Sequence, residues 1–177
     1  MMSMIDTERL SMRPMSESDA EAFARLRGDP PTMAGTTNGA IEPAAAMNLL
    51  TGYVTQWLET GLGMWAVIDR GSGEFIGECG FARRPTLREL TLRYALARDW
   101  WGRGLASEAV NGALDFGFGQ FGLDRVSAVA LETNDRSCRI LEGAGMTMAE
   151  QAFDGIDGFR RYHLTGDEWQ ARQEKVC

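Results

Sequence analysis

The pattern of hydrophobic and polar positions divides the chain into strand-like and helix-like runs in an interleaved order. Strand-like runs occupy residues 9–13, 64–69, 75–81, 87–96, 125–131, 146–153 and 159–164. Helix-like runs, with apolar residues three or four positions apart, occupy residues 16–27, 43–60, 106–118, 134–142 and 167–174. This order of strands and helices predicts one α/β domain with a mixed sheet over residues 1–177.

Short polar turns connect the strands between residues 64 and 96. A turn over residues 70–73 (Arg-Gly-Ser-Gly) joins the first two strands, and the three together predict an antiparallel meander. A second hairpin is predicted near the C-terminus, where residues 154–158 (Asp-Gly-Ile-Asp-Gly) separate two strands.

Residues with known end preferences mark the first two helices. Ser18 and Glu21 predict a capping box and Gly28 the end of the first helix, while Pro43 suits the start of the second and Gly61 follows its last residue. One face of the second helix is predicted to be core: Met47, Leu50, Val54, Trp57 and Leu58. The breaker-rich residues 29–39 are interpreted as a flexible connection rather than a phosphate loop.

Composition restricts the class of protein. The formal net charge is −7 and Lys175 is the only lysine, which argues against non-specific nucleic-acid binding. No apolar run approaches the length of about 18 residues that a membrane span requires, and residues 1–8 lack a signal-peptide pattern, so a cytoplasmic protein is expected. Cys79, Cys138 and Cys177 form no metal-spaced cluster, and His163 is the only histidine, so no metal site is expected.

Residues 99–110 (Asp-Trp-Trp-Gly-Arg-Gly-Leu-Ala-Ser-Glu-Ala-Val) join a strand-like run to a helix-like run and carry the strongest functional signal. The first backbone N–H groups of a helix have no intrahelical partner, and the helix dipole adds partial positive charge there. Gly102 and Gly104 have no Cβ, so an anion can approach the backbone closely. This turn is predicted to hold the pyrophosphate of a nucleotide-like cofactor.

Further motifs surround this turn in a characteristic order. After the helix and a strand come residues 132–146 (Glu-Thr-Asn-Asp-Arg-Ser-Cys-Arg-Ile-Leu-Glu-Gly-Ala-Gly-Met), and the chain begins with residues 7–14 (Thr-Glu-Arg-Leu-Ser-Met-Arg-Pro) followed by Asp19 and Ala20. Residues 164–169 (Leu-Thr-Gly-Asp-Glu-Trp) stand near its end. Together these motifs resemble the RimJ/RimL-type branch of the GNAT superfamily of N-acetyltransferases. Tryptophan is common in that branch at the position that Trp101 occupies here.

The resemblance implies a central, mixed but mostly antiparallel twisted sheet flanked by helices, with acetyl-CoA in a cleft between the two central strands. Backbone N–H groups of residues 102–107 would bind the pyrophosphate, and residues 96–97 would pair with the pantetheine arm, one of their N–H groups facing the thioester oxygen. The implied cofactor-binding residues are Leu96, Ala97, Gly102, Arg103, Gly104, Leu105, Ala106, Ser107, Asn134 and Ser137. Asn134 is also a favoured helix N-cap, a role compatible with ligand contact.

The implied reaction is acetyl transfer from acetyl-CoA to a primary amine, a protein N-terminus or a small molecule, by direct attack on the thioester. Ser137 resembles a serine proposed to protonate the leaving thiolate; the alternative is a small residue that lets CoA approach. Many relatives have a tyrosine acid where this chain has Leu141. Glu78 is the first candidate for the base, and Glu89 or a water chain are the alternatives.

Two other functions agree less well with the motifs of the sequence than acetyl transfer does. A catalytically inactive acyl-CoA sensor of the same fold is the alternative, since Leu141 replaces the tyrosine and the base is not fixed. A dinucleotide oxidoreductase is disfavoured because the glycine turn follows a meander and lacks a third glycine. The family resemblance places the acceptor pocket at residues 29–43 and 153–159, in a monomer or a homodimer, and the sequence does not identify the amine.

Overall fold

An eight-stranded sheet runs through the protein in the order β1-β2-β3-β4-β5-β6-β8-β7. The computed structural model describes residues 3–84, 87–149 and 158–176. Its strands are β1 (Ile5–Asp6), β2 (Leu10–Pro14), β3 (Met64–Asp69), β4 (Phe75–Arg84), β5 (Leu87–Leu96), β6 (Arg125–Leu131), β7 (Thr147–Met148) and β8 (Phe159–Thr165). Neighbouring strands are antiparallel except β5 and β6, which are parallel. The mixed, mostly antiparallel sheet and its β3–β4–β5 meander are therefore confirmed.

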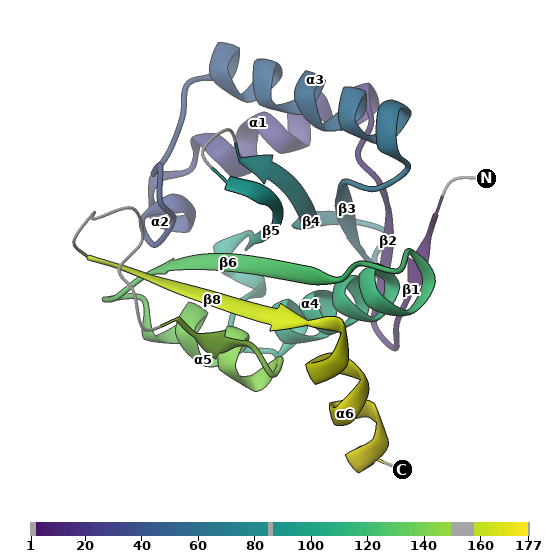
Figure 1. Cartoon of the computed structure of the whole chain (residues 1–177). Helices are drawn as coiled ribbons and strands as arrows, with labels where there is room; N and C mark the ends of the chain where they lie inside the picture. Colours follow the sequence, from purple (N-terminus) through teal and green to yellow (C-terminus); the bar gives the residue numbers. More distant parts are fainter. Residues whose placement is uncertain (1–2, 85–86, 150–157, 177) are drawn as a thin grey trace.

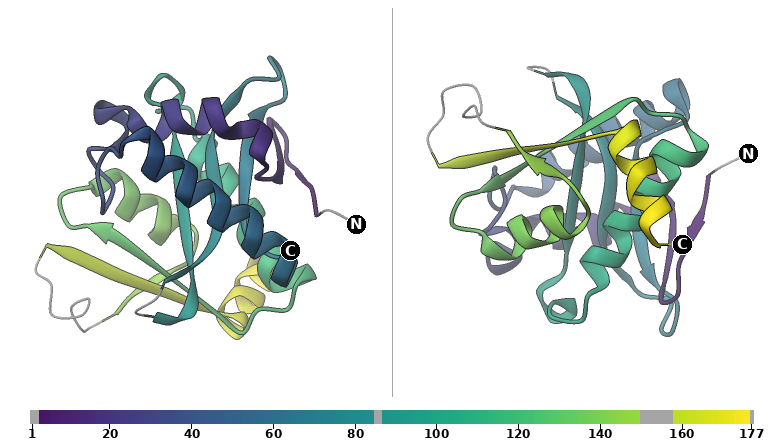
Figure 2. Two further views of the ribbon diagram at one scale, coloured as in Figure 1. Left: turned by 90° about the horizontal axis from the view of Figure 1, so that it is seen from above. Right: turned by 60° about the horizontal axis from the view of Figure 1, so that its bottom comes forward.

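Helices cover both faces of this sheet. They are α1 (Ala20–Gly28), α2 (Pro30–Met33), α3 (Pro43–Thr60), α4 (Leu105–Asp115), α5 (Asp135–Gly143) and α6 (Gly166–Val176). The short turn η1 (Glu17–Asp19) precedes α1, and the short turn η2 (Arg98–Trp100) follows β5. A π-helical turn, η3 (Phe116–Gln120), continues α4. Helices α1 and α3 lie on one face and α4 and α5 on the other (Figure 1); α1 and α3 run side by side across the strands (Figure 2).

Helix α3 has the bounds that the sequence predicts, because Pro43 occupies its first position and Gly61 ends it with a left-handed φ of 71°. Its buried residues are Ala46, Leu50 and Tyr53. The predicted core face is wrong for Met47 and Leu58, which are 40% and 84% exposed. Apolar residues stand on more than one side of this helix, and contact with the sheet selects the side that carries Tyr53.

The first helix begins later than the sequence predicts. The capping box is formed by Ser16 and Asp19 rather than by Ser18 and Glu21, and it caps η1: the Asp19 carboxylate accepts a hydrogen bond from the Ser16 N–H at 2.9 Å. The guanidinium of Arg13 on β2 also donates two hydrogen bonds to Asp19, at 2.9 and 2.7 Å. This ion pair fixes Asp19 as the capping carboxylate, and the short turn η1 precedes α1.

Two other segments differ from the predicted elements. Residues 29–39 contain the short helix α2, because Asp29 accepts a hydrogen bond from the Thr32 N–H at 3.0 Å and prolines follow Asp29. Of the predicted strand over residues 146–153, the structure forms only the two-residue β7, and described residues 146 and 149 are not strand. Residues 150–153, and residues 154–157 of the predicted turn, lie outside the described residues. No helix in the described part of the chain has the length and apolarity needed to cross a membrane.

A gap in the middle of the sheet separates β5 from β6. The two strands pair at one position, Thr91 with Ser127, whose hydroxyl oxygens are 3.4 Å apart. Beyond that pair, residues 92–96 and 128–131 form no ladder with each other, so the strands diverge. The predicted cleft between the two central strands corresponds to the space that opens where β5 and β6 diverge.

Candidate active site

A cavity of about 430 Å³ lies between the diverging strands β5 and β6. Residues 91–96 of β5 and 128–131 of β6 line it, together with parts of α2, α5 and the α2–α3 connection. Of the residues predicted for the site, the cavity wall contains Leu96, Ala106, Asn134, Ser137 and Glu78. The other predicted residues are not on this wall. They lie between Leu96 and α4 (Ala97, Gly102, Arg103 and Gly104) or in the first turn of α4 (Leu105 and Ser107).

The cavity passes through the sheet and therefore has two ends. Glu78 pairs with Ala95, and Ala95 packs against α1 and α2 through Leu26 and Met33, so these side chains face α1. Leu92 and Leu96 pack in the opposite core with α4 and α5. We call the part with Arg27, Thr32, Glu78 and Arg93 the α1 end, and the part with Tyr94, Leu96, Ala106 and Ser137 the α5 end.

The glycine turn before α4 has the backbone that an anion site requires. Gly102 and Gly104 have left-handed φ angles of 75° and 76°, and Gly104 is the N-cap of α4. A Cβ at Gly102 would meet nothing within 4 Å, so the turn keeps open space beside its backbone. The indole of Trp101 donates to the Leu96 carbonyl at 2.7 Å and lies 3.9 Å under the Arg136 guanidinium. Trp101 thus ties the turn to both β5 and α5.

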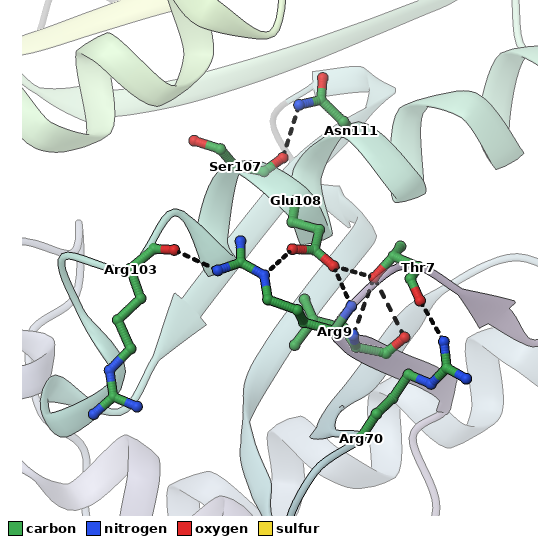
Figure 3. Close-up of polar contacts among 8 residues, drawn as sticks. Thr7, Arg9, Arg70, Arg103, Ser107, Glu108 and Asn111 are labelled. Carbon is green, nitrogen blue, oxygen red and sulfur yellow. Dashed lines mark hydrogen bonds and ion pairs between the residues drawn. The ribbon is translucent and has the colours of Figure 1, made fainter.

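Arg9 holds the start of α4, and sequence reasoning missed this contact. Its guanidinium donates to the Arg103 carbonyl at 2.8 Å and to the Glu108 carboxylate at 2.7 Å, while Thr7 donates to Glu108 at 2.6 Å (Figure 3). Partial burial raises the pKa of Glu108, but hydrogen bonds from Thr7 and Arg9 outweigh it, and the pKa is lowered overall. Glu108 is therefore a structural anion that clamps the turn.

The last residues of β5 differ in where their backbone N–H groups point. The N–H of Ala97 donates to the Ile76 carbonyl of β4 at 2.8 Å, so of the two predicted donors Ala97 is already engaged. Backbone groups alternate between the two sides of a strand, and the N–H of Leu96 consequently points away from β4, into the gap. Of the two predicted residues, Leu96 is the one whose N–H remains available to a ligand in the gap.

The first turn of α5 brings Asn134, Ser137 and Tyr94 together. Asn134 is the N-cap, accepting from the Ser137 N–H at 3.1 Å, and its amide nitrogen donates to the Gly35 carbonyl at 2.9 Å. The hydroxyl oxygens of Tyr94 and Ser137 are 2.6 Å apart at the α5 end. Sequence reasoning sought a tyrosine at position 141, where the buried Leu141 lines the wall, and missed Tyr94 on β5.

Comparison with known proteins identifies the family. The sequence matches the acetyltransferase (GNAT) domain over residues 9–147. The chain belongs to the GNAT acetyltransferases. It is 30% identical over 142 residues to the uncharacterized N-acetyltransferase p20 of Bacillus licheniformis, a match that covers 79% of this chain and 80% of that protein. Membership of this family supports acetyl transfer from acetyl-CoA to amines, with acetyl-CoA as the co-substrate.

Solved structures share the fold of this GNAT acetyltransferase. The acetyltransferase from Agrobacterium tumefaciens str. C58 superposes with a TM-score of 0.82 at 24% identity, covering 92% of this chain and 94% of that one. A spermidine N-acetyltransferase from Vibrio cholerae, solved with CoA and spermine, gives a TM-score of 0.74 at 18% identity, with coverage of 93% and 99%. These similarities confirm a single GNAT fold.

The described residues of this GNAT acetyltransferase fit acetyl-CoA. The turn with Gly102 and Gly104 exposes backbone N–H groups without side chains, and the gap beside Leu96 has an unused strand edge along which a pantetheine arm can lie. Near the turn, the Arg103 guanidinium stacks over Trp100 at 4.9 Å, and the backbone N–H of Arg98 donates to the Thr32 hydroxyl at 3.2 Å. Within the described residues, no group of three or more His, Cys, Asp or Glu side chains could hold a metal ion.

A buried ion pair occupies the α1 end. The carboxylate of Glu78 accepts a hydrogen bond from the Arg27 guanidinium, and both residues are buried, at 0% and 4% exposure. Arg27 also donates to the Tyr53 hydroxyl at 3.2 Å. Glu78 therefore faces the cavity, as the sequence predicts, but as half of an ion pair whose arginine sequence reasoning did not include. The side chain of Glu89, the second candidate, lies outside the described residues.

All three tyrosines hold their protons more tightly than free tyrosine. Burial raises the pKa of Tyr53 to about 12, and burial also raises the pKa values of Tyr94 and Tyr162. Since the unfolded value is about 10, the resulting stabilisation is fully present below about pH 10 and is lost as the pH rises through the folded-state values. We expect no phenolate absorbance step near pH 10 in the folded protein and a normal step in denaturant; a normal step in the folded protein would contradict the burial.

Proposed function

We propose that this acetyltransferase, a member of the RimJ/RimL-type branch, transfers an acetyl group from acetyl-CoA to the primary amine of a small molecule or a protein N-terminus by direct attack on the thioester. The observation that carries the proposal is the cavity through the sheet. It joins the α5 end, next to the glycine turn, to a buried carboxylate at the α1 end. Donor and acceptor can therefore approach from opposite faces and meet between β5 and β6.

The α5 end is suited to the acyl donor. Backbone N–H groups of residues 102–107 hold the pyrophosphate, and Asn134 and the edge of β5 hold the pantetheine arm. The N–H of Leu96 donates to the thioester oxygen, where negative charge develops as the amine attacks. This amide is already fixed by the strand, so it needs no rearrangement to act.

The chemical balance defines what the remaining residues must do. A bond forms between the amine nitrogen and the acetyl carbon, the carbon–sulfur bond breaks, one amine proton leaves and the thiolate takes up a proton. Alkylammonium groups have a pKa of about 10.4, so the acceptor first loses one proton, which passes on to solvent; the second amine proton leaves as the amide forms and balances the one that the thiolate takes up. We assign the proton that leaves before the attack to Glu78, a residue of the cavity wall whose Oε2 has no hydrogen-bond partner among the described residues.

The hydroxyl pair of Ser137 and Tyr94 is assigned to the leaving thiolate. One hydroxyl donates to the other across 2.6 Å, so the pair holds a proton at the α5 end, beside the strand that carries Leu96. Burial raises the pKa of Tyr94, which keeps its hydroxyl protonated at neutral pH. Tyr94 and Ser137 together take the place of the tyrosine that is absent at position 141.

We expect Tyr94→Phe to lower kcat roughly 100-fold, the usual scale for loss of general acid catalysis, with little change in KM for acetyl-CoA. Ser137→Ala should lower kcat similarly, and the double variant should add little because the two hydroxyls act as a unit. Tyr162→Phe is the matched control, since the Tyr162 hydroxyl bonds Glu142 outside the cavity wall. An unchanged kcat in Tyr94→Phe would remove Tyr94 from the mechanism.

Thiol release tests the function as a whole. The protein is incubated with acetyl-CoA and a panel of peptides with free N-termini, amino acids, polyamines and aminoglycosides, and free CoA is measured. Release that depends on an amine is the expected result. Thermal stabilisation by CoA without release in the presence of any amine would instead establish the acyl-CoA sensor.

The buried free thiols Cys79 and Cys138 agree with the reducing, cytoplasmic location that we also propose.

A further inference from the structure

The α1 end of the cavity contains buried charged groups with unused hydrogen-bonding capacity. The side chains of Arg27 and Glu78 are 5% and 1% exposed. Within the described residues, neither Nε of Arg27 nor Oε2 of Glu78 has a hydrogen-bond partner. Both residues lie on the cavity wall. Buried polar groups are nearly always satisfied, so this ion pair is unusual in retaining a donor and an acceptor that its own contacts leave unused.

The bonds that Arg27 does make leave one side of its guanidinium open. Nη2 donates to Glu78 and, at 3.2 Å, to the hydroxyl of Tyr53. Among the described residues, the acceptor that faces Nη1 is the sulfur of Met33 at 4.0 Å, and a thioether is a weak acceptor. Arg27 can therefore still donate to a ligand oxygen while Glu78 accepts from a ligand N–H.

Arg93 adds a second positive charge to this end. On β5 it pairs with Gly80, two positions along from the Ala95–Glu78 pair, so its side chain is on the same face of the sheet as Glu78. Arg93 lines the cavity and forms no ion pair with any described residue. Two arginines and one carboxylate leave the α1 end with a net positive charge.

We propose that the amine acceptor is a free α-amino acid or an equally compact aminocarboxylate. Its amine meets Glu78 and its carboxylate meets Arg27 and Arg93. This inference rests on the proposed acetyl transfer and specifies the acceptor. A polyamine would bring a second cation toward two arginines, which is unfavourable. A peptide N-terminus offers a neutral carbonyl where the arginines call for an anion, so it would leave the extra positive charge unpaired.

A matched series of acceptors tests the carboxylate directly. For each α-amino acid that is turned over, kcat/KM is compared with that of its primary amide and of the amine that lacks the carboxylate. We expect the amino acid to exceed the plain amine by roughly 100-fold, the effect of one or two charge-assisted hydrogen bonds. Equal or better turnover of the plain amine, of spermidine or of a peptide N-terminus would overturn the proposal while leaving acetyl transfer intact.

The variant Arg93→Gln tests the residue. We expect it to lower the ratio of kcat/KM between the amino acid and its plain amine by roughly 10- to 100-fold, with the thermal shift on CoA binding unchanged. Arg83→Gln, an exposed arginine on β4, is the matched control and should leave the ratio unchanged. A ratio unaffected by Arg93→Gln would contradict the assignment of the carboxylate.

Calorimetry separates this inference from the proposed function. Amino acids and their matched amines are titrated into the protein saturated with CoA, which requires no turnover. Selective binding of the amino acids, weakened by Arg93→Gln, would support the acceptor assignment even if no acetyl transfer occurred. Absence of such binding would overturn the assignment. Failure of every amine to release CoA from acetyl-CoA would instead overturn the acetyltransferase proposal.

Discussion

Gly104→Glu is expected to abolish binding of CoA. Gly104 caps α4 with a left-handed φ of 76°, at the turn proposed to hold the pyrophosphate. A carboxylate placed about 4 Å from a phosphate charge near the surface costs about 4 kcal/mol, so the Kd for CoA should rise by roughly 100-fold or more. Isothermal titration with CoA and the thermal shift produced by CoA measure the effect. Affinity close to that of the wild type in a folded variant would refute the placement of the phosphate.

Backbone strain has to be separated from charge in this experiment, and the chain offers a matched control. Gly61, at the end of α3, has a similar φ of 71°, and a Cβ there would meet nothing within 4 Å. Gly61→Glu therefore adds the same side chain at the same kind of backbone position, away from the cavity wall. We expect it to lower the melting temperature slightly and to leave CoA affinity unchanged.

Arg27→Met is expected to lower the free energy of unfolding by about 3–5 kcal/mol, because it leaves the buried carboxylate of Glu78 without its partner. Arg27 and Glu78 are both buried, and Glu78 is wholly enclosed at 0% exposure. Denaturant titration followed by circular dichroism measures the change. Loss of less than about 1 kcal/mol would show that the pair is not a buried charge pair at all.

Two further variants identify the cause of that loss. Arg25 lies two residues earlier on α1 and forms an ion pair with Glu21, with side chains that are 74% and 86% exposed, so Arg25→Met should change stability by less than about 1 kcal/mol. The double variant Arg27→Met with Glu78→Leu removes both charges and should recover much of the stability, since a buried pair is often no more stable than apolar residues of similar size. The double variant should nevertheless lack acetyltransferase activity, because it has lost the proposed base Glu78.

Elements with strong end signals could be predicted from sequence almost to the residue. The bounds of α3, β3, β5 and β6 match the predictions because glycine, proline or polar turns mark the ends of these runs. The predicted glycine turn has the left-handed backbone that it requires at Gly102 and Gly104. These features depend on the conformational preferences of neighbouring residues, which can be read directly from a sequence.

The parts of the site that sequence reasoning missed depend on contacts between distant segments. Arg27 stands in an amphipathic helix, where an arginine normally indicates solvent, and only its approach to Glu78, 51 residues away, buries it. Tyr94 is one aromatic residue in a strand until α5 places Ser137 against it, 43 residues later. Arg9 reaches Glu108 across 99 residues. No periodicity or local motif records these pairings.

The divergence of β5 and β6 gives the protein two unpaired strand edges in its interior rather than at its surface. Exposed edges invite pairing with other chains and hence aggregation, and proteins usually protect them with charges, prolines or covering segments. Here residues 92–96 and 128–131 face one another across the cavity, with α5 and the α2–α3 connection on its wall. The protein can thus keep backbone hydrogen-bonding groups available for a strand-like ligand without offering them to a neighbouring molecule.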